Sequence, residues 1–259
     1  MKLNRHLLLA IVFCLLIFSA CKRIRPYTIS GTLDLPEQIP FGDTIIDVPS
    51  FDGSWVYLLD FENQLLDSAQ IIDKSFQFKG EVDDKDPYFV QFVSQLGSTL
   101  IVIEPGNIEV NINPDIVVSG TPSNDAMADL DMALEELNTE TRDYYAQLTD
   151  SMHMLGEEVS DEMDMQIAEK YRESMNHILD SIYQANRHNV AAGYAVILRH
   201  IDIQSADEFE KALEQYPKSI RENELVQINL RNLRQYEQWD EDDSITFDPS
   251  ILGVEELEN

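Results

Sequence analysis

The stretch Ser119-Gly120-Thr121-Pro122-Ser123-Asn124 divides the sequence into two parts with different patterns. Before it, short β-branched or aromatic segments are separated by Gly, Pro, Asn and Asp, which is typical of strands joined by turns. After it, apolar residues recur at helical spacing behind residues that cap helices. We therefore predict an α+β fold, in which an N-terminal antiparallel β-sandwich or meander is followed by an α-helical array.

Working outward from this junction, the first part contains several predicted strands. Asp73-Lys74 and Pro105-Gly106-Asn107 consist of residue types that favour tight reversals between strands. Residues 36–52 contain three prolines, which disfavour regular pairing, and we expect a long loop there. The predicted strands cover residues 27–33, 55–59, 75–80, 88–93, 99–103 and 108–113.

The second part contains residues that begin helices. Asn124 is placed to cap a helix running towards Tyr145, and Ser160 is placed to cap a second helix. Two further serines have the capping-box spacing, in which a hydroxyl and a carboxylate satisfy reciprocal backbone donors. These pairs are Ser205 with Glu208 and Ser219 with Glu222. We expect four or five helices, packed as antiparallel hairpins.

The N-terminus has the layout of a secretory signal peptide. Lys2 and Arg5 precede an apolar run at residues 7–18, and Phe18-Ser19-Ala20-Cys21 resembles the bacterial lipobox. A helix of about a dozen residues, rising ~1.5 Å per residue, is too short for a ~30 Å hydrocarbon core. We predict that cleavage occurs before Cys21 and that lipid on this cysteine anchors the protein to a membrane.

These patterns predict five segments along the chain. They are a signal peptide at 1–20, a lipidated tether at 21–26, a β-rich domain at 27–120, an α-helical domain at 121–238 and an acidic tail at 239–259. Lys22-Arg23-Ile24-Arg25 follows the cysteine without Asp or an early acidic cluster. By analogy with bacterial sorting rules, we expect delivery to the outer membrane, facing the periplasm.

Charge and cysteine content exclude several classes of function. The chain has 18 basic and 48 acidic residues, a net charge of −30, and we therefore expect no nucleic-acid partner. Cys14 lies in the predicted signal peptide and Cys21 is blocked by lipid, which leaves no free thiol for disulfide exchange or metal binding. Hydrophobic residues make up 44% of the chain, which indicates a folded protein rather than a disordered acidic one.

Five motifs follow one another along the chain, namely Tyr27-Thr28-Ile29-Ser30-Gly31-Thr32, Val56-Tyr57-Leu58-Leu59-Asp60, Leu66-Asp67-Ser68-Ala69, Phe76-Gln77-Phe78-Lys79-Gly80 and Ser119-Gly120-Thr121-Pro122-Ser123-Asn124-Asp125-Ala126. Their order resembles the Bacteroidetes envelope lipoproteins that begin with the β-rich domain of unknown function 4369. The resemblance implies an arrangement that is common in that family, in which the β domain is followed by a helical segment and then by a thioredoxin-like domain. This chain stops where that domain would start and has no Cys-x-x-Cys, so we do not expect the redox activity here.

Few residues suggest catalysis or metal binding. Glu173 and His177 share one helical face at metal-ligand spacing, but a solvated face explains them more simply. His188 and His200 flank an apolar segment and fit core-edge positions. The acidic runs 83–86 and 240–243 lack the alternating ligands and central glycine of a calcium loop. We predict no enzyme, no cofactor and no metal site.

Two modification sites and three function classes remain. Asp followed by Ser or Thr and a small or aliphatic residue resembles the Bacteroidetes O-glycosylation motif, and Thr44 and Ser244 are the most accessible acceptors. We expect a non-catalytic accessory or interaction lipoprotein of the cell envelope with an envelope-protein partner. The alternatives are a ligand-binding lipoprotein that uses Trp55, Tyr57 or Trp239, and a partner-dependent accessory of a thiol-disulfide redox system.

Overall fold

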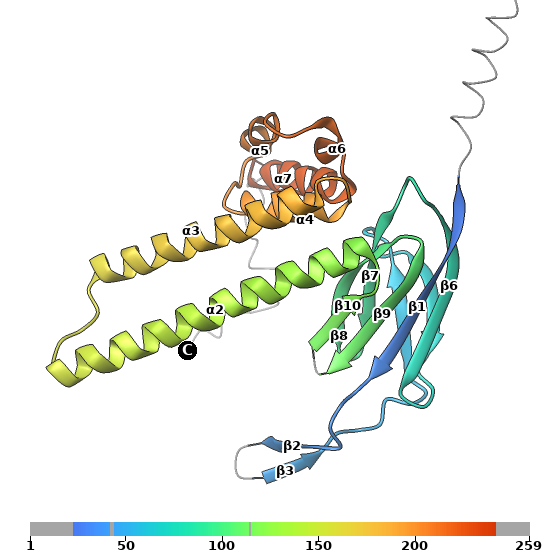
Figure 1. Ribbon diagram of the computed structural model, residues 1–259, viewed down its shortest axis with the longest axis horizontal. Helices are drawn as coiled ribbons and strands as arrows, with labels where there is room; N and C mark the ends of the chain where they lie inside the picture. The colour runs from blue at the N-terminus through green and yellow to red at the C-terminus, as the bar shows by residue number, and fades with distance from the viewer. Residues whose placement is uncertain (1–22, 42–43, 114, 242–259) are drawn as a thin grey trace, which may run out of the picture. The chain divides into compact units, whose positions relative to one another are not determined.

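The computed structural model describes residues 23–41, 44–113 and 115–241 (Figure 1). The chain divides into two compact units, Met1–Ala192 and Gly193–Asn259. The first unit holds the described strands together with the two longest helices, α2 (Pro122–Leu155) and α3 (Asp161–Asn186). The predicted helical domain at 121–238 is therefore wrong as a compact unit, because its two long helices belong with the strands.

Eight of the ten described strands form two four-stranded sheets around one core, and the predicted α+β fold with an N-terminal sandwich is confirmed. In the first sheet the order is β10-β9-β1-β6, and in the second it is β5-β4-β7-β8. Buried side chains from the inner faces of both sheets form one apolar cluster. The first sheet comprises β10 (Asp115–Ser119), β9 (Gly106–Asn113), β1 (Ile24–Leu33) and β6 (Ser75–Asp83). The second comprises β5 (Leu65–Gln70), β4 (Trp55–Leu59), β7 (Tyr88–Ser94) and β8 (Gly97–Ile103).

The chain departs from a simple meander because it changes sheets at several connections, among them β5 to β6 and β8 to β9. Asp73 and Lys74 both have positive φ, and they make the predicted tight reversal before β6. By contrast, Pro105 lies in a connection that carries the chain from the second sheet to the first, where β9 runs parallel to β1. The reversal predicted at residues 105–107 is therefore wrong as a hairpin turn, because β8 and β9 do not pair with each other, whereas Ile72 and Ser75 pair across the turn at Asp73 and Lys74.

A small hairpin replaces the long loop predicted at residues 36–52. Strands β2 (Gln38–Phe41) and β3 (Thr44–Asp47) pair antiparallel, with Pro40 opposite Ile45. Both strands of a two-stranded sheet are edge strands, and such strands tolerate a proline. The sequence rule therefore fails here because it assumed that proline excludes pairing altogether.

Strand β1 begins earlier than the sequence predicted. Ile24 is opposite Asp83 and Pro26 is opposite Glu81, so these residues belong to the first sheet. Arg25 also forms an ion pair with Asp84, with 3.3 Å between Nη1 and Oδ1. The tether predicted at residues 21–26 is therefore too long, because its second half is strand.

Two glycines of β1 and β6 lie opposite aromatic rings on the neighbouring strand. Gly31 is paired with Phe76, and Gly80 is paired with Tyr27. A Cβ added at Gly31 would overlap the Phe76 ring, and one added at Gly80 would lie 2.5 Å from the Tyr27 ring. These glycines therefore make room for aromatic side chains that cover the sheet.

Helices α2 and α3 lie side by side and antiparallel in the first unit (Figure 1). The predicted cap of α3 is confirmed, because the Ser160 hydroxyl accepts a hydrogen bond from the Met163 N–H at 3.3 Å. The predicted cap of α2 is wrong. Thr121 occupies the N-cap position, and Asn124 is buried in the first turn.

The second unit is a group of shorter helices around its own apolar core. The cap predicted at Ser205 is right in position, although its hydroxyl makes no capping bond. Ser219 lies inside its helix, because Pro217 is the N-cap. The helices are α4 (Ala191–Arg199), α5 (Ala206–Leu213), α6 (Lys218–Arg221) and α7 (Glu224–Glu241). The core includes Ala195, Val196, Phe209, Leu213, Ile220, Val226 and Leu230.

Helix α7 is capped by Asn223, whose side-chain oxygen accepts from the backbone N–H of Leu225 at 3.0 Å. The helix extends to Glu241, so the acidic tail predicted from residue 239 begins too early. The rest of that tail and the predicted signal peptide lie outside the described residues. In the part of the chain that is described, no helix combines the length and apolarity needed to cross a bilayer.

Candidate functional site

Buried polar side chains fix the first turn of α2 to strand β8. The Asn124 side chain accepts a hydrogen bond from the Val102 N–H at 2.9 Å and donates one to the Val102 carbonyl at 2.9 Å. Its amide thus pairs with the strand as a further peptide group would. The Glu104 carboxylate accepts from the Ser123 N–H at 2.7 Å and from the Ser123 hydroxyl at 2.8 Å. A carboxylate is favourable at a helix N-terminus, so the base of α2 is held firmly.

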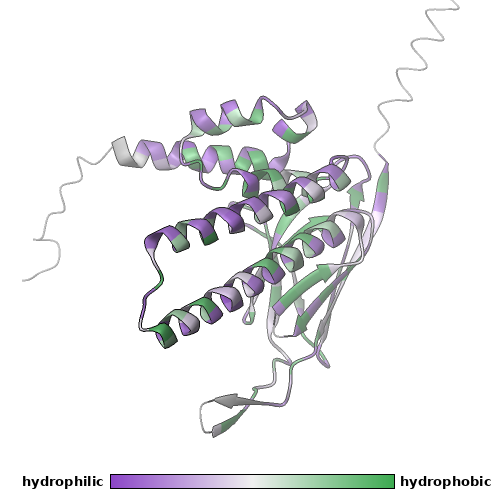
Figure 2. Ribbon diagram, turned by 60° about the vertical axis from the view of Figure 1, so that its left-hand side comes forward, coloured by the Kyte–Doolittle hydropathy of each residue, from purple (hydrophilic) through white to green (hydrophobic). Residues whose placement is uncertain are grey.

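Beyond this base, the two helices form an arm with no core of its own. We call residues 131–178 the helical arm. Leu130 is the last buried side chain of α2 and Leu179 is the only buried one of α3, so every side chain between them is half-buried or exposed. Figure 2 shows that hydrophilic positions predominate along both helices and that apolar positions are interspersed among them. Such a pair leaves much of its apolar seam open to water.

Polar and aromatic contacts join the two helices of the arm. The Tyr171 hydroxyl donates a hydrogen bond to Asn138 Oδ1 at 2.6 Å. Lys170 Nζ lies 5.8 Å from the centre of the Tyr144 ring, within range of a cation–π interaction. A hydrogen bond with the Asp164 carboxylate raises the pKa of Tyr145. These contacts align the helices without closing the apolar seam.

Two adjoining hollows, of about 600 and 270 Å³, run between the helices of the arm, and we call them together the arm groove. Leu137, Glu140 and Ser174 line both hollows, which makes them continuous. The lining residues that are half-buried form the floor of the groove, and the exposed ones form its edges. The floor comprises Ala133, Leu137, Thr141, Ile167, Tyr171, Ser174 and Ile178, and the edges comprise Glu136, Glu140, Tyr144, Lys170, Glu173 and His177.

Glu173 and His177, the pair at metal-ligand spacing, lie on one edge of the arm groove. Glu136 and Glu140 have the same four-residue spacing on α2 and line the same hollow, although neither was predicted as a site residue from the sequence. The four-residue spacing of these two glutamates was the sequence signal that could have identified them. Across residues 23–41, 44–113 and 115–241, no three His, Cys, Asp or Glu side chains are grouped closely enough to hold a metal ion.

The other histidine and acidic candidates have structural surroundings. His188 is exposed after α3, whereas His200 is half-buried with its Nε2 3.1 Å from the Tyr216 hydroxyl. Burial lowers the pKa of His200, and Arg199 lowers it further. In the acidic run 83–86, Asp84 forms the ion pairs with the arginines that precede and begin β1. This carboxylate therefore helps to hold the start of the first sheet.

Trp55 and Tyr57 share the outer face of β4, since Val56 and Leu58 between and beside them are buried in the core. Trp55 is 48% exposed, and both aromatic residues line a hollow of about 530 Å³ with Val93 of β7. The structure thus brings together two of the three aromatic residues considered for ligand binding. The structure does not describe the side chain of Trp239, the third of these residues.

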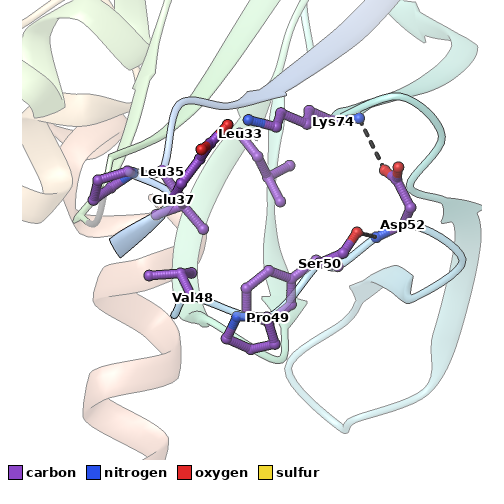
Figure 3. A pocket seen from close by; sticks show the side chains of 10 residues that line it. Leu33, Leu35, Glu37, Val48, Pro49, Ser50, Asp52 and Lys74 are labelled. Carbon is purple, nitrogen blue, oxygen red and sulfur yellow. Dashed lines mark hydrogen bonds between the residues drawn. The ribbon is translucent and has the colours of Figure 1, made fainter. Parts of the chain in front are cut away.

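A further hollow lies where the β2–β3 hairpin meets the sandwich. Figure 3 shows Leu33, Val48 and Pro49 around it, and Lys74 at its edge. The Lys74 backbone N–H donates to Asp52 Oδ1 at 3.0 Å, which closes that edge. Its volume is about 190 Å³, below the ~300 Å³ at which small-molecule pockets usually start. We therefore do not assign it a ligand.

The predicted modification sites are only partly visible. Cys21 and Ser244 lie outside the described residues. Thr44 is exposed, but it begins strand β3 opposite Phe41 rather than lying in a loop.

Residues 27–127 match a family model described as Domain of unknown function (DUF4369). The match begins in β1, spans both sheets and ends in the first turns of α2, just beyond the Asn124 contacts with β8. The β-rich part of the chain is therefore similar to this domain of unknown function, as the strand motifs predicted. No curated protein matches the chain.

Proposed function

We propose that this chain, with its DUF4369 domain, is a non-catalytic lipoprotein of the bacterial cell envelope that binds another envelope protein through the helical arm. One observation carries the proposal. Residues 131–178 form two long helices that contain no buried side chain, although they share an apolar groove floor.

Helices in proteins gain most of their stability by burying an apolar face. In the arm, the floor residues Leu137, Ile167 and Ile178 remain half-buried, because only one helix lies on each side of them. Grooves of this type commonly accept a further helix. The buried contacts of Asn124 and Glu104 support the proposal, because a firmly held base presents the groove in a defined direction.

In this proposal, lipid on Cys21 anchors the protein to the outer membrane, where it faces the periplasm. Strand β1 begins at Ile24, three residues after the cysteine. Three extended residues span about 10 Å. The lipid would therefore hold the sandwich close to the membrane surface, with Lys22 and Arg23 next to anionic headgroups.

A second candidate function is favoured by one observation. Trp55 and Tyr57 line an exposed hollow on the second sheet, and aromatic side chains of this kind suit a ligand-binding lipoprotein. The polar side chains that line this hollow are half-buried or exposed, so none of them is held in a fixed orientation by burial, and we rank the hollow below the arm groove.

Photo-crosslinking in the native host tests the proposal. A photoreactive amino acid is placed at Thr141 or Ser174 on the groove floor, and a matched control is placed at Ala146, which is exposed on the arm and does not line the groove. We expect both floor positions to give the same discrete crosslinked protein and the control to give none. Identical crosslinks from all three positions, or none from the floor positions, would overturn the proposal.

A further inference from the structure

We propose that the arm groove binds a basic amphipathic helix, that is, a helix with an apolar stripe flanked by Lys and Arg. This inference rests on the proposed function of the arm as a docking surface. It adds the chemistry of the partner.

The first support is the charge of the arm. Residues 131–178 contain 13 Asp and Glu against 3 Lys and Arg. At the groove itself, Glu136 and Glu140 line one side, and Glu173 lines the other. The basic residue among the lining side chains is Lys170, which lies over the Tyr144 ring. A positively charged partner would therefore meet carboxylates on both edges of an apolar floor.

The second support is the shape of the groove. On α2 its lining runs from Ala133 to Tyr144, and on α3 it runs from Ile167 to Ile178. Eleven residues at ~1.5 Å per residue span about 17 Å, or roughly three helical turns. A helix of that length would place three or four apolar side chains on the floor. The positions of the partner helix that flank its apolar stripe would lie above the carboxylates at the edges of the groove.

The same charge argues against other occupants. A second copy of the chain would bring its own acidic arm against this one, and an anionic bilayer would repel it. The half-buried Leu137 and Ile167 also favour a partner with apolar side chains over a purely cationic, extended one.

Peptide binding to the full-length lipoprotein in a non-ionic detergent tests this inference. The probe is a fluorescent 14-residue peptide with Leu at helical i, i+3, i+4 and i+7 spacing and Lys elsewhere. One control peptide has Glu in place of Lys, and another has the same composition in a scrambled order. We expect the Leu/Lys helix to bind, the Glu peptide not to bind and the scrambled peptide to bind at least tenfold more weakly.

Matched variants locate the site. In Glu136→Gln/Glu140→Gln/Glu173→Gln, the loss of three groove carboxylates should weaken peptide binding by about tenfold at low salt, since each exposed ion pair with the peptide contributes modestly and three are lost. Asp143→Asn/Asp150→Asn/Glu158→Gln removes the same charge from arm residues that do not line the groove, and should weaken binding less than twofold. Circular dichroism confirms that both variants keep their helices.

Three outcomes would overturn the inference. One is equal weakening in both triple variants, which would mean attraction by net charge alone, and another is equal binding of the Lys and Glu peptides. The third is no binding of the Leu/Lys peptide while Thr141 and Ser174 still crosslink to a protein, which would reject a basic partner but keep the proposed function. If the crosslinks were absent as well, the proposed function itself would fail.

Discussion

Removing the Asn124 side chain should weaken the attachment of the first turn of α2 to strand β8. In the native structure Asn124 is buried, and its amide satisfies both the N–H and the carbonyl of Val102 and also donates to Thr121 Oγ1 at 2.8 Å. Asn124→Ala leaves the two Val102 groups without these partners. Each unsatisfied buried group costs about 1–3 kcal/mol. Because water will reach some of the space left by the amide, we expect a total loss of about 3–4 kcal/mol in the free energy of unfolding.

The measurement is urea unfolding of the full-length protein, followed by circular dichroism and tryptophan fluorescence. Amide hydrogen exchange at Val102 provides a local readout, since its N–H loses its acceptor and should exchange much faster. Asn138→Ala is the matched control, because it removes one exposed hydrogen bond, to Tyr171, and should cost about 1 kcal/mol or less. A loss in Asn124→Ala no larger than in the control, or unchanged exchange at Val102, would refute the reasoning.

Three further predictions concern the sandwich, the anchor and the surface. Burial, with a smaller effect of Tyr88, raises the pKa of Tyr27 to about 12. The unfolded tyrosine loses its proton near pH 10, so stability should fall between pH 10 and 12, by about 1–2 kcal/mol for this partly exposed group. Tyr27→Phe should abolish that fall, and the same urea midpoints in both proteins across this range would contradict it. Cys21→Ser should abolish palmitate labelling and release the protein from membranes while its thermal transition is kept; labelling that persists would exclude Cys21 as the acceptor. Intact mass spectrometry of the native protein should show glycan mass that decreases in Thr44→Ala/Ser244→Ala, whereas an unmodified native mass would remove the hypothesis.

The sequence by itself was sufficient for the elements whose signals are local. In β6, Phe76 and Phe78 alternate with polar residues, and the structure buries both while leaving Gln77 exposed. Ser160 precedes an apolar periodic run and caps α3. Signals of this kind act over two to four residues, so they depend little on what lies elsewhere in the chain.

Only the tertiary structure decided which segments meet. Alternation shows that one face of a strand is buried, but not that β1 pairs in parallel with β9 or that β8 and β9 belong to different sheets. Asn124 has the residue type of a helix cap, yet its amide bonds to Val102, 22 residues away, because the folded sheet brings a strand edge to that turn. The arm groove likewise combines Leu137 with Ile167 from separate helices. A helical period specifies the apolar face of each helix, whereas the partner of that face depends on how the connecting chain closes and how the side chains pack.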